Sequence, residues 1–160
     1  MPDSPIPRNS RVIVIVQCRL VVERCPGYYC VRAAEERTGI MACYPSDEPL
    51  RLFTIDCGGC CGRAVHRKLD LLCRTLAKHE AVERSQITVH LATCITHDNF
   101  HGPPCPHLDY LKKLIGKLNL TIREGTHISQ RAERRRSEGV YAVHPEQPDA
   151  CDRPAPVSQP

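Results

Sequence analysis

Four short runs of apolar and β-branched residues recur along the chain, and each has the length and composition of a β-strand. They cover residues 11–17, 50–56, 87–93 and 120–124. The first run, RVIVIVQ, is apolar at nearly every position instead of alternating with polar residues. Because a strand that is covered on both faces reads as a continuous apolar run, this stretch predicts a central strand of a buried sheet.

Between the strand-like runs, apolar residues recur at the three- and four-residue spacing of an amphipathic helix. These patterns cover about residues 26–38, 63–79 and 106–117. Strands that alternate with helices are typical of βαβ units, in which the strands run parallel and the helices cover the sheet. The pattern therefore predicts an α/β fold, a small four-stranded parallel sheet flanked by helices, Rossmann- or flavodoxin-like in the broad sense.

The periodic pattern ends near residue 128. Residues 144–160 contain five prolines and little apolar content, which is typical of a segment that cannot bury enough surface to fold. We expect one domain over residues 1–130 and a polar, proline-rich, disordered tail over residues 131–160.

Cysteine is the unusual component of the composition, with 11 cysteines accompanied by 8 histidines among 160 residues. The apolar run at residues 12–16 is too short for a signal peptide or a membrane span, so we expect a cytoplasmic protein with reduced thiols and no membrane partner. The net charge of +4 is mild, and no basic stripe is interleaved with aromatic residues, so we expect no nucleic-acid partner. An odd cysteine count fits a disulfide framework poorly, and the combination with histidine indicates a metal ion or catalysis.

Several of the cysteines directly follow the predicted strands. Cys18 follows the first strand, Cys57 the second and Cys94 the third, and the fourth strand leads into a Gly-Thr-His segment that ends at His127. The carboxyl ends of parallel strands meet at one edge of the sheet, where open α/β folds bind their ligands. We therefore expect these four residues to lie close together.

A second set of cysteines lies at the predicted helix starts. Cys25-Pro26 and Cys105-Pro106 share one arrangement, and because proline suits the first helical position, each cysteine is predicted to cap a helix whose dipole favours the thiolate. Further thiols are expected on the first turns of the first helix and in the turn before the second. The candidate metal ligands are Cys18, Cys25, Cys30, Cys57, Cys60, Cys94, Cys105 and His127.

Five ordered motifs, over about residues 11–128, together resemble the CGGC-domain family. They are Cys57-Gly58-Gly59-Cys60, Cys18-x6-Cys25-Pro26-Gly27-x2-Cys30, His90-Leu91-x2-Cys94, Cys105-Pro106-His107 and Gly125-Thr126-His127. The resemblance implies a metal-binding domain and favours zinc. Members commonly carry proline after the second motif cysteine, whereas this chain has Cys61, which adds a thiol beside the expected site.

Thiolate-rich ligation selects zinc or an iron–sulfur cluster over hard cations. Our core ligand set is Cys18, Cys57, Cys60 and Cys94, because these residues follow adjacent strands or lie in the same turn. Eight candidate ligands are enough for two metal ions. Three further cysteines are predicted to be structural or incidental, namely Cys43, Cys73 and Cys151.

Two enzyme functions remain open as hypotheses beside the zinc and iron–sulfur alternatives. Cys57 and Cys60 form a C-x-x-C pair between a strand and a helix, as in thiol–disulfide oxidoreductases. Cys57 and Arg63 also match the C-x5-R phosphatase loop, in which a thiolate attacks phosphorus and arginine binds the phosphoryl oxygens. Neither enzyme accounts for the thiols at the other strand ends, so the surplus of cysteines favours metal binding.

Overall fold

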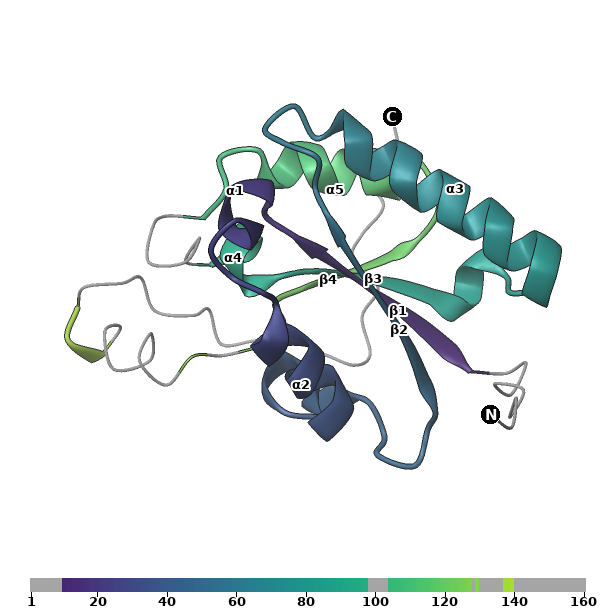
Figure 1. The fold of residues 1–160 in the computed structure, drawn as a ribbon, viewed down its shortest axis with the longest axis horizontal. Helices are drawn as coiled ribbons and strands as arrows, with labels where there is room; N and C mark the ends of the chain where they lie inside the picture. The colour runs from purple at the N-terminus through teal and green to yellow at the C-terminus, as the bar shows by residue number, and fades with distance from the viewer. Residues whose placement is uncertain (1–9, 98–103, 128, 130–136, 140–160) are drawn as a thin grey trace.

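The fold is a single parallel sheet with helices on both faces. A computed structural model describes residues 10–97, 104–127, 129 and 137–139. The sheet has the order β2-β1-β3-β4, and every pair of neighbouring strands is parallel. The strands are β1 (Arg11–Gln17), β2 (Leu50–Asp56), β3 (Ile87–Leu91) and β4 (Thr121–Glu124). The predicted α/β class and the four-stranded parallel sheet are therefore confirmed (Figure 1).

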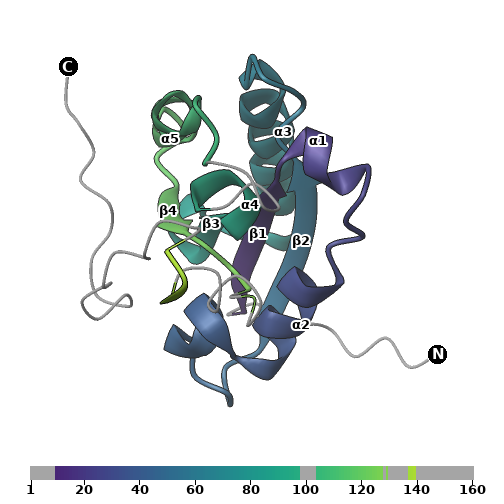
Figure 2. The same cartoon turned by 90° about the vertical axis from the view of Figure 1, so that its left-hand side faces the viewer.

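Within the described residues, three longer helices cover the sheet, and two single-turn helices lie beyond its carboxyl edge (Figures 1 and 2). Helices α3 (Arg63–Glu80) and α5 (Leu108–Gly116) pack together on one face, and α2 (Tyr28–Glu36) lies on the other. The single-turn helices are α1 (Arg19–Val22) and α4 (Thr93–Thr96), and two 3-10 helices are η1 (Gly39–Cys43) and η2 (Arg84–Gln86).

Strand β1 separates two hydrophobic clusters because its side chains alternate between the two faces. Val12, Val14 and Val16 pack in the cluster that includes the apolar residues of α3 and α5. Ile13 and Ile15 pack in the second cluster, against residues of α2 and η1. All five side chains are at most 1% exposed. Each such burial contributes about 2 kcal/mol to folding, and the prediction of a strand buried on both faces is confirmed.

Two helix starts differ from the prediction. The N-caps of α2 and α5 are Gly27 and His107, so Cys25 and Cys105 are not the capping residues. The Cys25 amide donates to the Val21 carbonyl, which extends the turn of α1, and the Cys105 amide donates to the Ile95 carbonyl. Each cysteine is therefore tied to a single-turn helix that the apolar pattern did not predict.

Parts of the sequence analysis fall on residues that the structure does not describe. The predicted tail over residues 131–160 lies almost wholly outside the described residues, so the domain boundary at residue 130 stays a prediction. Cys151 also lies outside them. Within the described ranges, no helix combines the length and the apolar character that crossing a membrane requires.

Candidate metal centre

The backbone continues its pairing just beyond the strands and so aligns the residues that follow them. The amide of Cys57 donates to the carbonyl of Gln17 at 2.9 Å, and the amide of Ala92 donates to the carbonyl of Val16 at 2.9 Å. The amide of Gly125 donates in the same way to the carbonyl of Leu91 at 2.7 Å. The segments after all four strands therefore lie along one edge, which Figure 2 shows beside α1 and α4.

Three of the predicted ligands meet where α1 begins. The sulfur of Cys94 lies 3.4 Å from the amide nitrogen of Cys18, and the sulfur of Cys57 lies 3.4 Å from the amide nitrogen of Arg19. Both amides donate to sulfur, although the partners are 76 and 38 residues apart in sequence. Cys18 and Cys57 are each only 7% exposed. The topology thus brings Cys18, Cys57 and Cys94 together, as the strand ends predict.

An aspartate that the sequence analysis left without a role holds the CGGC loop in shape. The Asp56 carboxylate accepts a hydrogen bond of 2.7 Å from the Gly58 amide and one of 2.8 Å from the Lys68 ammonium group. The Lys68 hydrogen bond is the main reason that the pKa of Asp56 lies below its usual value, and the Gly58 amide adds to the effect. An aspartate whose side chain binds the backbone amide two residues later is a common turn pattern, and it can be recognised in the sequence.

The three thiols of the CGGC loop face different environments. Cys57 is buried, whereas Cys60 and Cys61 are exposed at the centre of a turn in which the Gly62 amide donates to the Gly59 carbonyl at 3.0 Å. Glycine is required at position 58, where φ is +77° and a Cβ would stand 2.1 Å from that of Ala64. Cys57 therefore lies inside the protein at the carboxyl edge of the sheet, whereas Cys60 and Cys61 lie on the surface.

The same loop geometry disfavours the phosphatase alternative. A phosphatase loop needs free amides to bind phosphoryl oxygens, but the Gly58 amide is bonded to Asp56 and the Gly62 amide to Gly59. Arg63, the first residue of α3, is exposed.

Burial raises the pKa of several cysteines outside the CGGC loop. Together with the neighbouring thiols Cys30, Cys18 and Cys25, it raises the pKa of the Cys94 thiol to about 12. Burial also raises the pKa of Cys105, whose neighbouring thiols are Cys18, Cys57 and Cys60. The pKa of Cys105 is therefore raised overall, although a hydrogen bond from the backbone of His107, at the start of α5, acts in the opposite direction.

These neighbours divide the seven cysteine candidates into two groups that share Cys18. The first, named the loop group, consists of Cys18, Cys57, Cys60 and Cys105. The second, named the helix group, consists of Cys18, Cys25, Cys30 and Cys94. The division follows the two faces of the sheet only in part. Cys30 packs on the α2 side and Cys105 on the α3 side, but Cys25 also packs on the α3-side cluster and Cys94 contacts both clusters.

The chemistry of the donors fits a soft metal, although the side chains do not converge on one point. Every cysteine in the described ranges is a free thiol, and thiolates favour zinc or iron–sulfur clusters over magnesium or calcium. Among the same residues, no three cysteine, histidine or carboxylate side chains form a group that could hold a metal ion. Ligation would therefore require at least some of the thiols to rotate toward a common centre.

His127 lies beside the helix group with its ring turned to an aromatic neighbour. Its ring stacks on Tyr29 with the centroids 4.9 Å apart and the planes 21° from parallel. Its carbonyl accepts a hydrogen bond of 2.8 Å from the Thr93 hydroxyl. The fold thus places His127 at the predicted edge, with its ring stacked on Tyr29 of α2.

Behind the edge lies a buried histidine to which the sequence analysis assigned no role. His90 on β3 is fully buried, with Nδ1 2.9 Å from the Gly125 carbonyl and Nε2 2.7 Å from the Tyr44 hydroxyl. Because a carbonyl can only accept, Nδ1 carries the proton and Nε2 accepts from Tyr44. Burial lowers the pKa of His90 to about 4, so the ring is neutral and fixes the segment that leads to His127.

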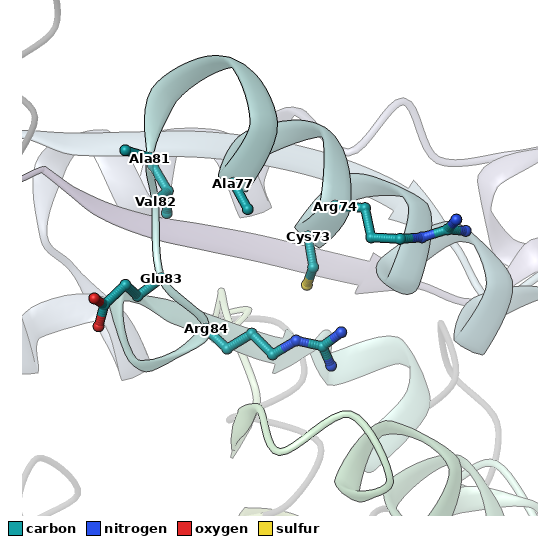
Figure 3. Close-up of a pocket in the computed structure, with 7 residues that line it drawn as sticks. All are labelled: Cys73, Arg74, Ala77, Ala81, Val82, Glu83 and Arg84. Atoms are coloured by element: carbon teal, nitrogen blue, oxygen red, sulfur yellow. The ribbon is translucent and has the colours of Figure 1, made fainter.

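Cys73 and Cys43 are two of the described cysteines outside the candidate ligand set. Cys73 is 3% exposed in the core cluster, as the helical pattern predicts, and Cys43 ends η1 beside the second cluster. Cys73 also lines a cavity of about 350 Å³ beside the carboxyl-terminal half of α3, far along the helix from the CGGC loop (Figure 3). Its remaining lining residues are Arg74, Ala77, Ala81, Val82, Glu83 and Arg84.

Comparison with known proteins identifies a family. The family model of the CGGC domain matches residues 12–127, which extend from the second residue of β1 through the segment after β4. Neither the curated proteins nor the solved structures gave a match to the chain.

Proposed function

The chain belongs to the CGGC-domain family, a family of metal-binding domains, and from this premise we propose that it binds zinc through thiolates at the carboxyl edge of its sheet. The observation that carries the proposal is the meeting of three strand ends at α1. There the sulfurs of Cys57 and Cys94 contact the adjacent amides of Cys18 and Arg19. Residues so far apart in sequence meet there only because the strands are parallel and adjacent.

The loop group and the helix group each offer four thiols, the number that completes a tetrahedral zinc shell. When bound, zinc would crosslink the strand ends in a closed shell or act as a Lewis acid at an open position. Cys18 belongs to both groups, so its sulfur would bridge two ions if both groups were filled. An iron–sulfur cluster needs the same four thiolates and is the alternative occupant.

Metal analysis of protein purified without oxygen and with zinc supplied tests the proposal. We expect at least one zinc ion per chain, without visible colour. Iron, labile sulfide and a brown colour would show that the thiolates hold an iron–sulfur cluster instead of zinc. Less than one metal ion per chain, in protein that was supplied with zinc and purified without oxygen, would contradict metal binding altogether.

A pair of variants tests the convergence of the strand ends. Cys94→Ser should lower the zinc content sharply, because a hydroxyl stays protonated and ligates zinc poorly. The matched control is Cys73→Ala, which removes a buried thiol from the core, should keep its zinc and should cost about 1 kcal/mol of stability. Full zinc content in a folded Cys94→Ser variant would refute the site as proposed here.

The thiol–disulfide oxidoreductase remains the second candidate because the buried Cys57 and the exposed Cys60 lie between β2 and α3. It predicts another pattern in the same experiment. Disulfide reduction would be lost in Cys57→Ser and Cys60→Ser and would persist in Cys94→Ser. Both functions start from reduced thiols, so we propose that the protein lies in the cytoplasm. For the metal-binding function, the proposed partner is a metal ion, and we propose neither nucleic acid nor a membrane as a partner.

A further inference from the structure

Two buried threonines join the start of α4 to the segment after β4. The amide of Thr126 donates to the hydroxyl of Thr93 at 3.0 Å, and the amide of Thr93 donates to the hydroxyl of Thr126 at 3.4 Å. Thr126 is fully buried and Thr93 is 9% exposed. This reciprocal pair fixes the backbone next to two predicted ligands, because Cys94 follows Thr93 and His127 follows Thr126.

The two hydroxyl protons go to different acceptors. Thr93 uses its proton on the carbonyl of His127, at 2.8 Å. The Thr126 oxygen accepts from the Thr93 amide, so its own proton remains for the Cys30 sulfur, 3.2 Å away. A deprotonated, metal-bound Cys30 has no proton to give. In that state the hydrogen bond must run from the Thr126 hydroxyl to the sulfur.

We propose that Thr126 is a positioning residue that holds the Cys30 sulfur in place as a metal ligand through a hydrogen bond from its hydroxyl. The inference rests on the metal site proposed above and adds a residue to it. A hydrogen bond from a fixed hydroxyl to a thiolate stabilises the negative charge and restricts rotation of the thiol. Groups that orient metal ligands in this way commonly change metal affinity by roughly 10- to 100-fold when they are removed.

The position of Thr126 is itself fixed from behind. The Thr126 carbonyl accepts from the Ile40 amide at 3.1 Å. The preceding residue, Gly125, is bonded through its carbonyl to His90, which is bonded in turn to Tyr44. This chain of buried groups runs from the second hydrophobic cluster to the Cys30 sulfur. A hydroxyl anchored at so many points has little freedom to move away when a metal ion binds.

Thr126→Val tests the proposal because valine keeps the shape of threonine and lacks the hydroxyl. We expect zinc to bind roughly 10-fold more weakly or worse in competition with a chelator, and the thiolate-to-metal absorption of the cobalt(II) form to shift. Thr126→Ser, which retains the hydroxyl, should restore both. Thr75→Val removes a hydroxyl that is bonded to the Leu71 carbonyl on the exposed side of α3. It is the control and should leave zinc affinity unchanged.

The same substitution in the Cys30→Ser variant distinguishes a positioning role of Thr126 from a general loss of structure. In Cys30→Ser protein, the further change Thr126→Val should alter zinc affinity little, because the bond that it removes no longer reaches a metal ligand. Wild-type affinity in Thr126→Val, or an equal loss in both backgrounds, would overturn the proposal and leave zinc binding itself standing. Failure of the wild-type protein to bind zinc would instead refute the proposed function.

Should Thr126→Val not fold, the wild-type protein still decides the question. Proton NMR of the cadmium-loaded protein should show a slowly exchanging Thr126 hydroxyl proton that is coupled to cadmium through the Cys30 sulfur. A freely exchanging hydroxyl without that coupling would overturn the proposal.

Discussion

His90 is a fully buried residue in the middle of the sheet, and its surroundings tie the stability of the protein to pH. Its pKa is about 4 in the folded protein and 6.5 in an unfolded chain. Between these two values the unfolded chain binds more protons, so the free energy of unfolding should fall as the pH falls from 6.5 to about 4. The contribution is complete above pH 6.5, is lost below pH 4, and amounts to about 3 kcal/mol.

Urea unfolding of the metal-free protein at a series of pH values measures this effect. His90→Gln should be less stable than the wild type near neutral pH, because glutamine cannot replace both hydrogen bonds with the same geometry. Its stability should vary less between pH 6.5 and pH 4, because glutamine does not titrate. Equal pH slopes for the two proteins would show that His90 is not the group responsible.

At the scale of single residues, the identity of the candidate ligands was easier to predict than their orientation. The position of Cys18, Cys57 and Cys94 after three parallel strands follows from sheet topology, which the apolar pattern indicates. Whether a thiol points inward depends on the local turn, and so the exposure of Cys60 did not follow from the motif. The stacking of His127 on Tyr29 depends on a residue of α2, so the sequence around His127 does not predict it.

At the scale of elements, the turn between β2 and α3 is the feature most exposed to a single substitution. Gly58→Ala would add a Cβ 2.1 Å from that of Ala64, at a φ of +77° that favours glycine. We expect a loss of about 1–3 kcal/mol in the free energy of unfolding. Zinc affinity should also fall, because the displaced turn carries Cys57 and Cys60. Chemical denaturation and zinc titration measure the two effects.

Two comparisons make the prediction for Gly58 specific. Gly116, at the end of α5, has open space around it, so Gly116→Ala should be neutral or slightly stabilising. Combining Gly58→Ala with Ala64→Gly removes the steric contact and retains the unfavourable φ, so the pair should be less destabilising than the sum of the two single changes. Additive losses would show that backbone strain alone accounts for the effect.

The strands were predicted more accurately than the helix starts, for a physical reason. Strands β1 and β2 match the predicted residues 11–17 and 50–56, and the two strands pair with each other along their whole length. The third prediction extended too far, since Thr93 is β-branched but its amide and hydroxyl bond to the segment after β4. Proline marked the two helix starts imperfectly, because α2 begins at Tyr28 and α5 at Leu108, in each case two residues after the proline.

At the scale of the whole molecule, the two hydrophobic clusters of the described residues lie within the domain that carries the family match. Among these residues, the last apolar one that packs on either cluster is Ile122 of β4, and the match to the family ends at residue 127. Residues 144–160 contribute five prolines and little apolar content. We therefore expect neither the core nor the candidate ligands to depend on that segment.

Removal of residues 144–160 should accordingly leave both the fold and the zinc content unchanged. The truncated chain should unfold at the temperature of the full chain and should bind zinc with the same stoichiometry, as calorimetry and metal analysis would measure. The contrasting control removes residues 121–160, which deletes β4 and exposes the edge of β3 together with its hydrogen-bonding groups. That shorter chain should aggregate or lose its cooperative transition. If the longer truncated chain also precipitates or loses zinc, residues 144–160 are part of the domain and the boundary near residue 130 is wrong.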